Sequence, residues 1–221
     1  MKLTELKLGG SKLKIPGFMV RMGGFVTSPR VYFNVVIHER REPLEPLLYV
    51  ALFAIAKWGL SGVLITGLVR SAMSSFGMTP FEALSEASWL RSLLVYGMIL
   101  GGAVSELFAW FLWSLLAHAV AKVLKGGGGY MRSLNVLGYA WVADVAVVAA
   151  LLFSILFPPL LILCIVVLIV SSVWKVVIAG IGLSEAHGFS LSKGLVSAVL
   201  PWLIMAAGVI VLTSPWWFLR W

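Results

Sequence analysis

Four ionisable residues, Lys57, Glu106, Asp144 and Lys175, lie inside long apolar stretches of the chain. A charged side chain near the centre of a bilayer costs about 2.5 kcal/mol or more unless it is paired or hydrated, so these residues are the first candidates for chemistry. A helical rise of about 1.5 Å per residue, counted from one side of the membrane, places all four in one slab. The pattern predicts two ion pairs, Lys57 with Glu106 and Asp144 with Lys175.

This intramembrane charged cluster has two interpretations. In the first, the four groups line a proton or ion path through the membrane. In the second, they form a buried polar cluster that fixes the helix register. Equal numbers of acids and bases favour the second interpretation, because matched pairs are what a satisfied, non-conducting core contains. A transporter is expected to have helices interrupted near mid-membrane, and Gly101-Gly102 and Pro201 are only weak examples.

The other chemically capable residues form no motif for catalysis or ligand binding. His38, His118 and His187 map to one side of the membrane but belong to three separate segments, without HxxxH spacing or a neighbouring cysteine. The single cysteine, Cys164, excludes an intrachain disulfide and a CxxC metal site. The four glycines at 126–129 lack the Gly-Lys-Ser/Thr of a phosphate-binding loop and predict a flexible loop. With no GxSxG or HExxH motif either, we predict no enzyme activity, no catalytic residue, no cofactor and no metal site.

The elements that carry these residues are five apolar stretches, each near the length of about 20 residues that crosses a bilayer. They cover residues 47–69, 93–121, 134–157, 160–182 and 195–213. Each stretch is continuously apolar rather than alternating, which favours helices over the strands of a barrel. A composition of 61% hydrophobic and 12% charged residues agrees. The sequence therefore predicts an all-α membrane protein with five transmembrane helices.

The distribution of positive charge predicts the topology. Eight of the 17 Lys and Arg residues precede the first span, so the positive-inside rule places the N-terminus in the cytoplasm. Five crossings then place the C-terminus outside, in a multi-pass protein of the cell membrane. Because the basic excess follows this topology, we expect the lipid bilayer and its anionic headgroups as partners, and no nucleic acid.

The N-terminal segment, residues 1–46, is expected to be a basic cytoplasmic unit ahead of a transmembrane domain at 47–221. Ser28-Pro29 predicts the start of a short amphipathic helix over residues 28–41. This helix suits the bilayer interface, and packing against the cytoplasmic ends of the bundle is the alternative. On the outer side, the sequence predicts a short helix near residues 80–90 and a tryptophan-rich interfacial segment at 215–221.

Several short motifs in the second half of the chain point to a known family. They are His118-Ala119, Gly128-Gly129-Tyr130, Leu137-Gly138-Tyr139-Ala140, Trp174, Ile181-Gly182-Leu183, and Ala186-His187-Gly188-Phe189-Ser190 before Lys193. With these motifs the chain resembles the Yip1 domain family of five-span membrane proteins. The motif residues taken forward are Gly138, Tyr139, Trp174, Gly182, His187 and Gly188. Ala143 stands where the eukaryotic branch has a proline, and the long acidic N-terminal region of that branch is missing, so the resemblance is to the prokaryotic type.

The resemblance implies five spans and a cytoplasmic N-terminus, and in the eukaryotic branch it implies binding of prenylated Rab GTPases and membrane shaping in trafficking. We therefore expect a non-enzymatic integral membrane scaffold that shapes membrane or recruits a protein partner at its cytoplasmic face. The surfaces expected to carry this role are the helix at 28–41 and the loops at 121–132 and 183–193. A small transporter or channel that uses the intramembrane charges is the alternative. The sequence leaves open whether the protein forms a homo-oligomer.

Overall fold

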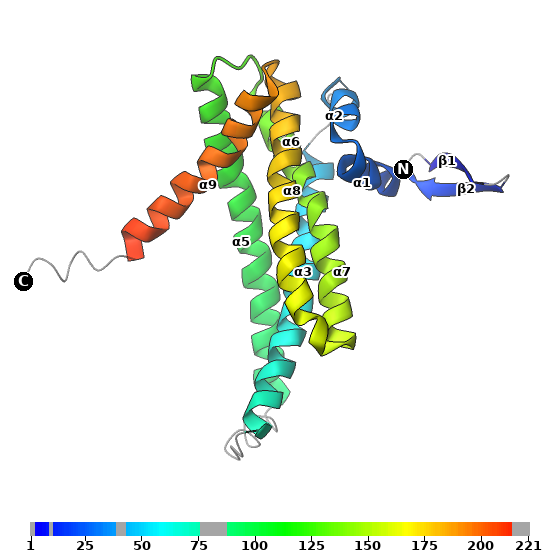
Figure 1. The fold of residues 1–221 in the computed structure, drawn as a ribbon, viewed down its shortest axis with the longest axis vertical. Helices are drawn as coiled ribbons and strands as arrows, with labels where there is room; N and C mark the ends of the chain where they lie inside the picture. Colours follow the sequence, from blue (N-terminus) through cyan, green and yellow to red (C-terminus); the bar gives the residue numbers. More distant parts are fainter. Residues whose placement is uncertain (1–2, 9–10, 39–42, 76–87, 214–221) are drawn as a thin grey trace, which may run out of the picture.

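The computed structural model describes residues 3–8, 11–38, 43–75 and 88–213, and Figure 1 shows a bundle of long helices with a smaller N-terminal part at its side. The short helix expected near residues 80–90 and the tryptophan-rich segment at 215–221 fall mainly or wholly outside these ranges. The N-terminal elements are β1 (Leu3–Leu8), β2 (Ser11–Pro16), α1 (Gly17–Thr27) and α2 (Pro29–His38). The bundle consists of α3 (Leu44–Ser75), α5 (Ser88–Val123), α6 (Tyr130–Ala140), α7 (Asp144–Leu156), α8 (Leu161–His187) and α9 (Leu191–Thr213).

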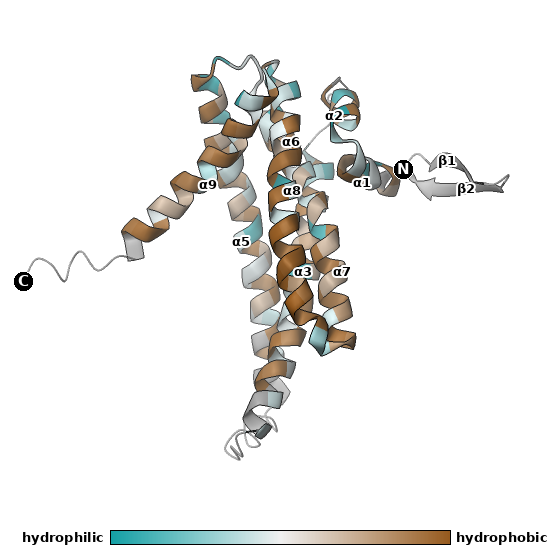
Figure 2. Cartoon of the chain, in the orientation of Figure 1, coloured by the Kyte–Doolittle hydropathy of each residue, from teal (hydrophilic) through white to brown (hydrophobic). Residues whose placement is uncertain are grey.

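Five segments in the described part of the chain are long and apolar enough to cross a membrane, which confirms the predicted fold class. They are Leu44–Val69, Val95–Val123, Tyr130–Leu156, Pro158–His187 and Leu191–Val211. Each lies within a few residues of a predicted stretch. Figure 2 shows apolar residues predominating along α7 and α8, as surfaces in contact with lipid require.

The third span is interrupted, which the sequence analysis did not predict. Helix α6 ends at Ala140, the 3-10 turn Trp141–Ala143 follows, and α7 starts at Asp144. The backbone stays right-handed through this turn, and the amides of Trp141 and Asp144 donate to the carbonyl oxygens of Gly138 and Trp141. The hydroxyl of Ser171 on α8 also donates to the carbonyl oxygen of Ala143, at 2.5 Å.

Helices α7 and α8 form an antiparallel hairpin, because Phe157-Pro158-Pro159 leaves almost no loop between them. The turn consists of the 3-10 segment Pro158–Leu160, and α7 packs along α8. At its other end α8 stops at Gly188, whose φ of +67° is the left-handed conformation that suits glycine at a helix C-terminus. The amide of Gly188 donates to Ser184 at 3.0 Å, and α9 then starts three residues later.

A two-stranded antiparallel hairpin precedes the helices, and the sequence analysis missed it. Strand β1 pairs with β2 from Leu3 opposite Pro16 to Leu8 opposite Ser11. The sequence did carry a signal, because apolar and polar residues alternate on both sides of Gly9-Gly10, a pair favoured in two-residue hairpin turns.

Helices α1 and α2 pack against the bundle, and we call residues 17–38 the shelf. Helix α2 starts at Pro29 as predicted. The fully buried rings of Phe25 and Phe33 contact Tyr139 of α6, at centroid distances of 4.5 Å and 6.5 Å. Tyr49 of α3 packs on the same tyrosine at 5.5 Å. Packing against the bundle, which was the alternative for this helix, is therefore present.

Polar contacts hold the shelf at three further points. Arg30 Nε donates to Glu185 Oε1 of α8 at 2.7 Å. Arg21 Nε donates to Glu45 Oε1 of α3 at 2.7 Å. The indole of Trp174 on α8 donates to the carbonyl oxygen of Val26 at 3.2 Å. The shelf is thus tied to α3, α6 and α8, while its outer side remains exposed.

The aromatic contact at Tyr139 predicts how the shelf is held. Phe25→Ala removes a fully buried ring, and such truncations cost about 3–5 kcal/mol. We expect faster amide hydrogen exchange over residues 17–38 with unchanged exchange in α8. Met19→Ala, which truncates an exposed side chain of the same helix, is the matched control. Equal exchange in the two variants would contradict the packing role of Phe25.

Candidate functional site

The four intramembrane charges meet in one continuous group, which we call the charged tetrad. Lys57 Nζ pairs with Glu106 Oε1 and also lies 3.2 Å from Asp144 Oδ2. Lys175 Nζ lies 2.7 Å from Asp144 Oδ1. Both pairs expected from the sequence are formed, and the contact between Lys57 and Asp144 joins them in the order Glu106, Lys57, Asp144, Lys175. Acids and bases alternate along this order, so neighbouring charges always attract.

The tetrad is buried and connects four helices. The exposed fractions of its side chains run from 5% for Asp144 to 18% for Lys57. One member comes from each of α3, α5, α7 and α8. Asp144 occupies the first turn of α7, where the positive end of the helix dipole stabilises a carboxylate. The 3-10 turn before Asp144 thus puts this acid at the start of α7.

Trp141 completes the tetrad, and sequence reasoning missed it. Its indole Nε1 donates to Glu106 Oε2 at 2.9 Å. The ammonium of Lys175 lies over the same indole, 4.5 Å from the ring centroid, which adds a cation–π contact. One side chain thus contacts both ends of the charged chain. The only sequence signal is a tryptophan three residues before the intramembrane aspartate, and nothing in the spacing marks it as a ligand of Glu106.

Of the six motif residues, Gly138, Tyr139, Trp174 and Gly182 lie at contacts of the bundle with the shelf or with the start of α3, whereas His187 and Gly188 lie at the end of α8. A Cβ at Gly138 would come to 2.5 Å from Pro46 Cβ, and one at Gly182 would come to 2.8 Å from the Phe33 ring. These two glycines let the start of α3 and the shelf approach the bundle. Tyr139 and Trp174 hold the shelf through the contacts described above. The motif therefore maps to helix packing.

His187 and His118 come together at the end of the bundle where α8 ends and α6 begins. Ser133 Oγ lies 2.8 Å from His187 Nε2 and 3.2 Å from His118 Nδ1, so one hydroxyl bridges the two rings. The side chain of His38 lies outside the described residues. Among the side chains that the structure does describe, no three His, Cys, Asp or Glu residues are grouped as metal ligands.

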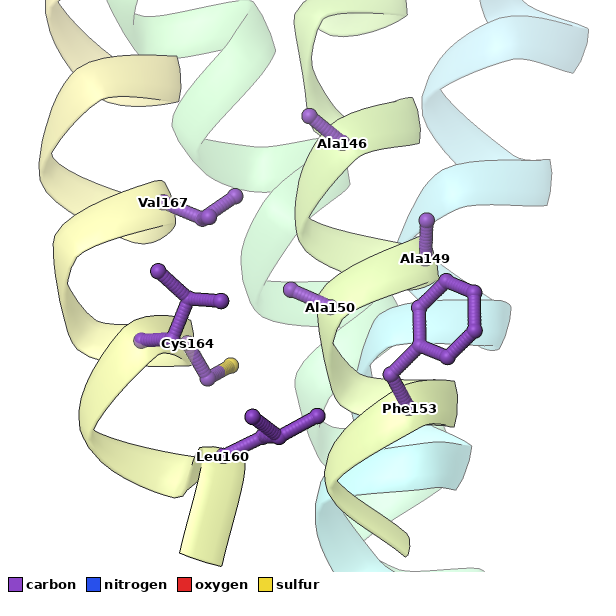
Figure 3. A pocket seen from close by; sticks show the side chains of 8 residues that line it. Ala146, Ala149, Ala150, Phe153, Leu160, Cys164 and Val167 are labelled. Atoms are coloured by element: carbon purple, nitrogen blue, oxygen red, sulfur yellow. The ribbon is translucent and has the colours of Figure 1, made fainter. Parts of the chain in front are cut away.

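An apolar cavity of about 340 Å³ lies between α7 and α8. Figure 3 shows Ala150 of α7 and Cys164 of α8 on its facing sides, with Leu160 of the preceding 3-10 turn and Val167 of α8 also lining it. The small alanine side chains of α7 leave this space open. Cys164 supplies the one polarisable group among the lining side chains. The side chains in its walls offer no charge or strong hydrogen bond to orient a polar ligand.

The order of charges in the tetrad predicts that the loss of Lys57 affects its two acidic partners differently. Lys57→Met leaves Glu106 without a cation while Asp144 keeps Lys175, and breaking a buried pair costs about 3–5 kcal/mol. Adding Glu106→Gln should restore much of that stability, because the Trp141 indole can still donate to the amide oxygen. Folded fraction in detergent is the measurement.

The matched control is Lys57→Met with Asp144→Asn. That combination leaves both Glu106 and Lys175 unpaired, so it should be less stable than Lys57→Met alone. If both double variants recover equally, the order of charges in the tetrad does not determine stability.

Comparison with known proteins identifies the family. The Yip1 domain model matches residues 23–212, from within α1 to the end of α9. No curated protein and no solved structure matches the chain. The match covers most of the 221 residues and contains the five spans, the tetrad and the contacts around Tyr139. The chain is a multi-pass membrane protein that belongs to the Yip1 domain family.

Proposed function

We propose that this protein is an integral membrane scaffold that shapes the bilayer and recruits partners at its cytoplasmic face. Proteins of the Yip1 family are generally non-enzymatic membrane proteins, which agrees with this role. The observation that carries the proposal is the shelf: an amphipathic pair of helices fixed to the side of the bundle, with apolar side chains left exposed.

The exposed side of the shelf is apolar where lipid would meet it. Met19, Val31 and Val35 are 55%, 63% and 51% exposed. Val31 and Val35 are four residues apart on α2 and so share one face of the helix. In Figure 1, α1 runs outward from the bundle whereas α3, α5 and α8 run along it. Such helices displace headgroups in one leaflet only, and an area difference between leaflets bends a membrane.

Rigid attachment distinguishes the shelf from a free amphipathic helix. A free helix must be ordered by the membrane, whereas the contacts of Phe25 and Phe33 with Tyr139 order the shelf in advance. The eight Lys and Arg residues that precede the first span add attraction to anionic headgroups, of about 1 kcal/mol for each one near the surface. The proposed unit at residues 1–46 thus combines charge with an insertable apolar face.

Three segments proposed as the partner-binding face lie close together. Arg30 of α2 pairs with Glu185 near the end of α8. The amide of Gly127, in the loop between α5 and α6, donates to His187 at 3.0 Å. These contacts join the shelf and both neighbouring loops into one surface, which is what recruitment of a partner, or of a second copy, requires.

The charged tetrad supports the scaffold over a transporter. Each of its four side chains contacts an opposite charge, and the indole of Trp141 satisfies Glu106 further. A conducting group must exchange its partner for the transported ion, and strong internal pairing opposes that exchange. We propose that the tetrad fixes the relative positions of α3, α5, α7 and α8 so that the shelf has a rigid support.

Membrane shaping predicts that the exposed valines of the shelf are required. A Val31→Ser and Val35→Ser double variant should keep its fold, because both side chains are exposed, but should lose most of its effect on membrane shape. Purified protein reconstituted into anionic liposomes and imaged by cryo-electron microscopy provides the measurement. Wild type is expected to give smaller vesicles or tubules.

The matched control is Val123→Ser, which removes a valine that is 81% exposed at the same end of the bundle but outside the shelf. This variant should remodel liposomes as wild type does. If the double variant remodels liposomes as wild type does, the exposed valines of the shelf do not shape the membrane, and the proposal is wrong.

The proposed orientation predicts opposite labelling of the two bundle ends. Gly127→Cys should react with an impermeant thiol reagent from the cytoplasmic side only, and Ser75→Cys from outside only, because basic residues concentrate near the first position. Both positions are exposed, and the native Cys164 is buried. A Cys164→Ala background removes residual labelling. Labelling of both sites from the same side would contradict the proposed topology, in which the span Val95–Val123 separates the two positions.

A further inference from the structure

The N-terminus of α6 is open and has no side-chain cap. Gly129 is the N-cap residue, with φ of −86° and ψ of 165°, and it supplies no side-chain hydrogen bond. The amides of Arg132 and Ser133 donate to the carbonyl oxygen of Gly129 at 3.1 Å and 3.4 Å, whereas the amides of Tyr130 and Met131, at the first two positions, have no acceptor within the helix. A Cβ built at Gly129 meets nothing within 4 Å, so there is free space at this terminus. The positive end of the α6 dipole therefore faces an open space.

A buried imidazole nitrogen beside this terminus lacks a partner. His187 is 4% exposed, and its Nδ1 has no hydrogen-bond partner among the described residues. Nδ1 faces the glycine loop, which we define as residues 124–129, because a Cβ at Gly126 or Gly128 would come to 2.6 Å or 3.0 Å from it. Unpaired buried polar atoms are uncommon because each costs free energy, so this nitrogen points to a missing partner.

Hydrogen bonds connect the glycine loop, for which the sequence predicts a flexible loop, to its neighbours. The amide of Gly126 donates to Ala121 at 2.8 Å, and the amide of Gly127 donates to His187 at 3.0 Å. Lys122 Nζ and Lys193 Nζ each approach a loop carbonyl oxygen at 3.4 Å. The run of glycines is needed because side chains at 126 and 128 would collide with His187 and the end of α8.

The surroundings of the loop are positively charged. Lys122, Lys125 and Arg132 lie within eleven positions of one another, and no Asp or Glu occurs between residues 118 and 143. Glu185, the acid nearest in sequence to His187, is paired with Arg30. Cationic side chains, free helix amides and a donor without an acceptor all favour an anion here.

We propose that the glycine loop and the N-terminus of α6 bind a phosphate group. The first amides of α6 donate to its oxygens, and Arg132 and Lys125 neutralise its charge. The glycine loop covers His187 Nδ1 at Gly126 and Gly128, so it has to move aside for a phosphate oxygen to reach this nitrogen. A directed chain of hydrogen bonds then runs from His118 Nδ1 to Ser133 Oγ, from Ser133 to His187 Nε2, and from His187 Nδ1 to the phosphate. The second span ends and the third begins at this loop, and the ends of the fourth and fifth spans contact it through His187 and Lys193. The ends of spans lie at the depth of the phospholipid headgroups. The phosphate comes from a lipid headgroup or from solution, and this inference does not rest on the scaffold function.

The decisive variant is Gly129→Asp in the full-length protein. An aspartate at the N-cap supplies its own carboxylate to the same amides, so it should raise the unfolding temperature without phosphate and remove the response to phosphate. The apparent affinity should fall on the order of tenfold or more. Gly129→Ala is the matched control, because φ and the free space accept a Cβ but no anion is added. It should respond as wild type does.

Two arms of the experiment distinguish the sources of the phosphate. In detergent, inorganic phosphate is titrated against chloride at equal ionic strength. In nanodiscs, phosphatidylcholine alone is compared with phosphatidylcholine containing phosphatidic acid. Stabilisation in the first arm identifies free phosphate, and stabilisation in the second arm alone identifies a lipid headgroup. The proposal is overturned if neither arm stabilises the wild type, or if Gly129→Asp responds as strongly as Gly129→Ala.

Discussion

Four charges in a hydrocarbon environment must find partners inside the protein, and the arrangement of the helices depends on this constraint. Between helices in lipid there is little hydrophobic driving force, so close packing and polar contacts determine which faces meet. The charged tetrad takes one residue from each of α3, α5, α7 and α8 and aligns them at one depth. A slip of any of these helices by one turn would separate a charge from its partner. The tetrad therefore determines register as well as contact.

The break in the third span serves both the tetrad and the shelf. Asp144 lies directly after the 3-10 turn in the first turn of α7, and Trp141, within the turn, contacts both Glu106 and Lys175 through its indole. On the other side of the break, Tyr139 presents its ring to Phe25. Two residues separated by one position thus support the charged core and the N-terminal helices. Local hydrogen bonds satisfy backbone groups at this break, and the Ser171 contact is one of them.

The features that carry the two proposals gather at one end of the molecule. The shelf offers an apolar face to lipid, and the glycine loop offers amides and positive charge to an anion. The contact of Arg30 with Glu185 links α2 to the end of α8, whose next residues hold the loop through His187. A phosphate bound at the loop and a leaflet displaced by the shelf would therefore act on the same side of the membrane. The tetrad supplies the rigid bundle that both need.

The sequence by itself determined the class of the protein, its five spans, the start of α2 at Pro29 and the four buried charges, because each depends on local composition or on the high cost of a charge in lipid. The alternation of apolar and polar residues also indicated the two N-terminal strands. Only the tertiary structure decided that Lys57 bridges both acids, that Trp141 contacts both ends of the tetrad and that His187 faces the glycine loop. The physical reason is that these contacts join residues from separate helices, and helix rotation and depth, which bring them together, are set by packing over the whole bundle rather than by any local pattern.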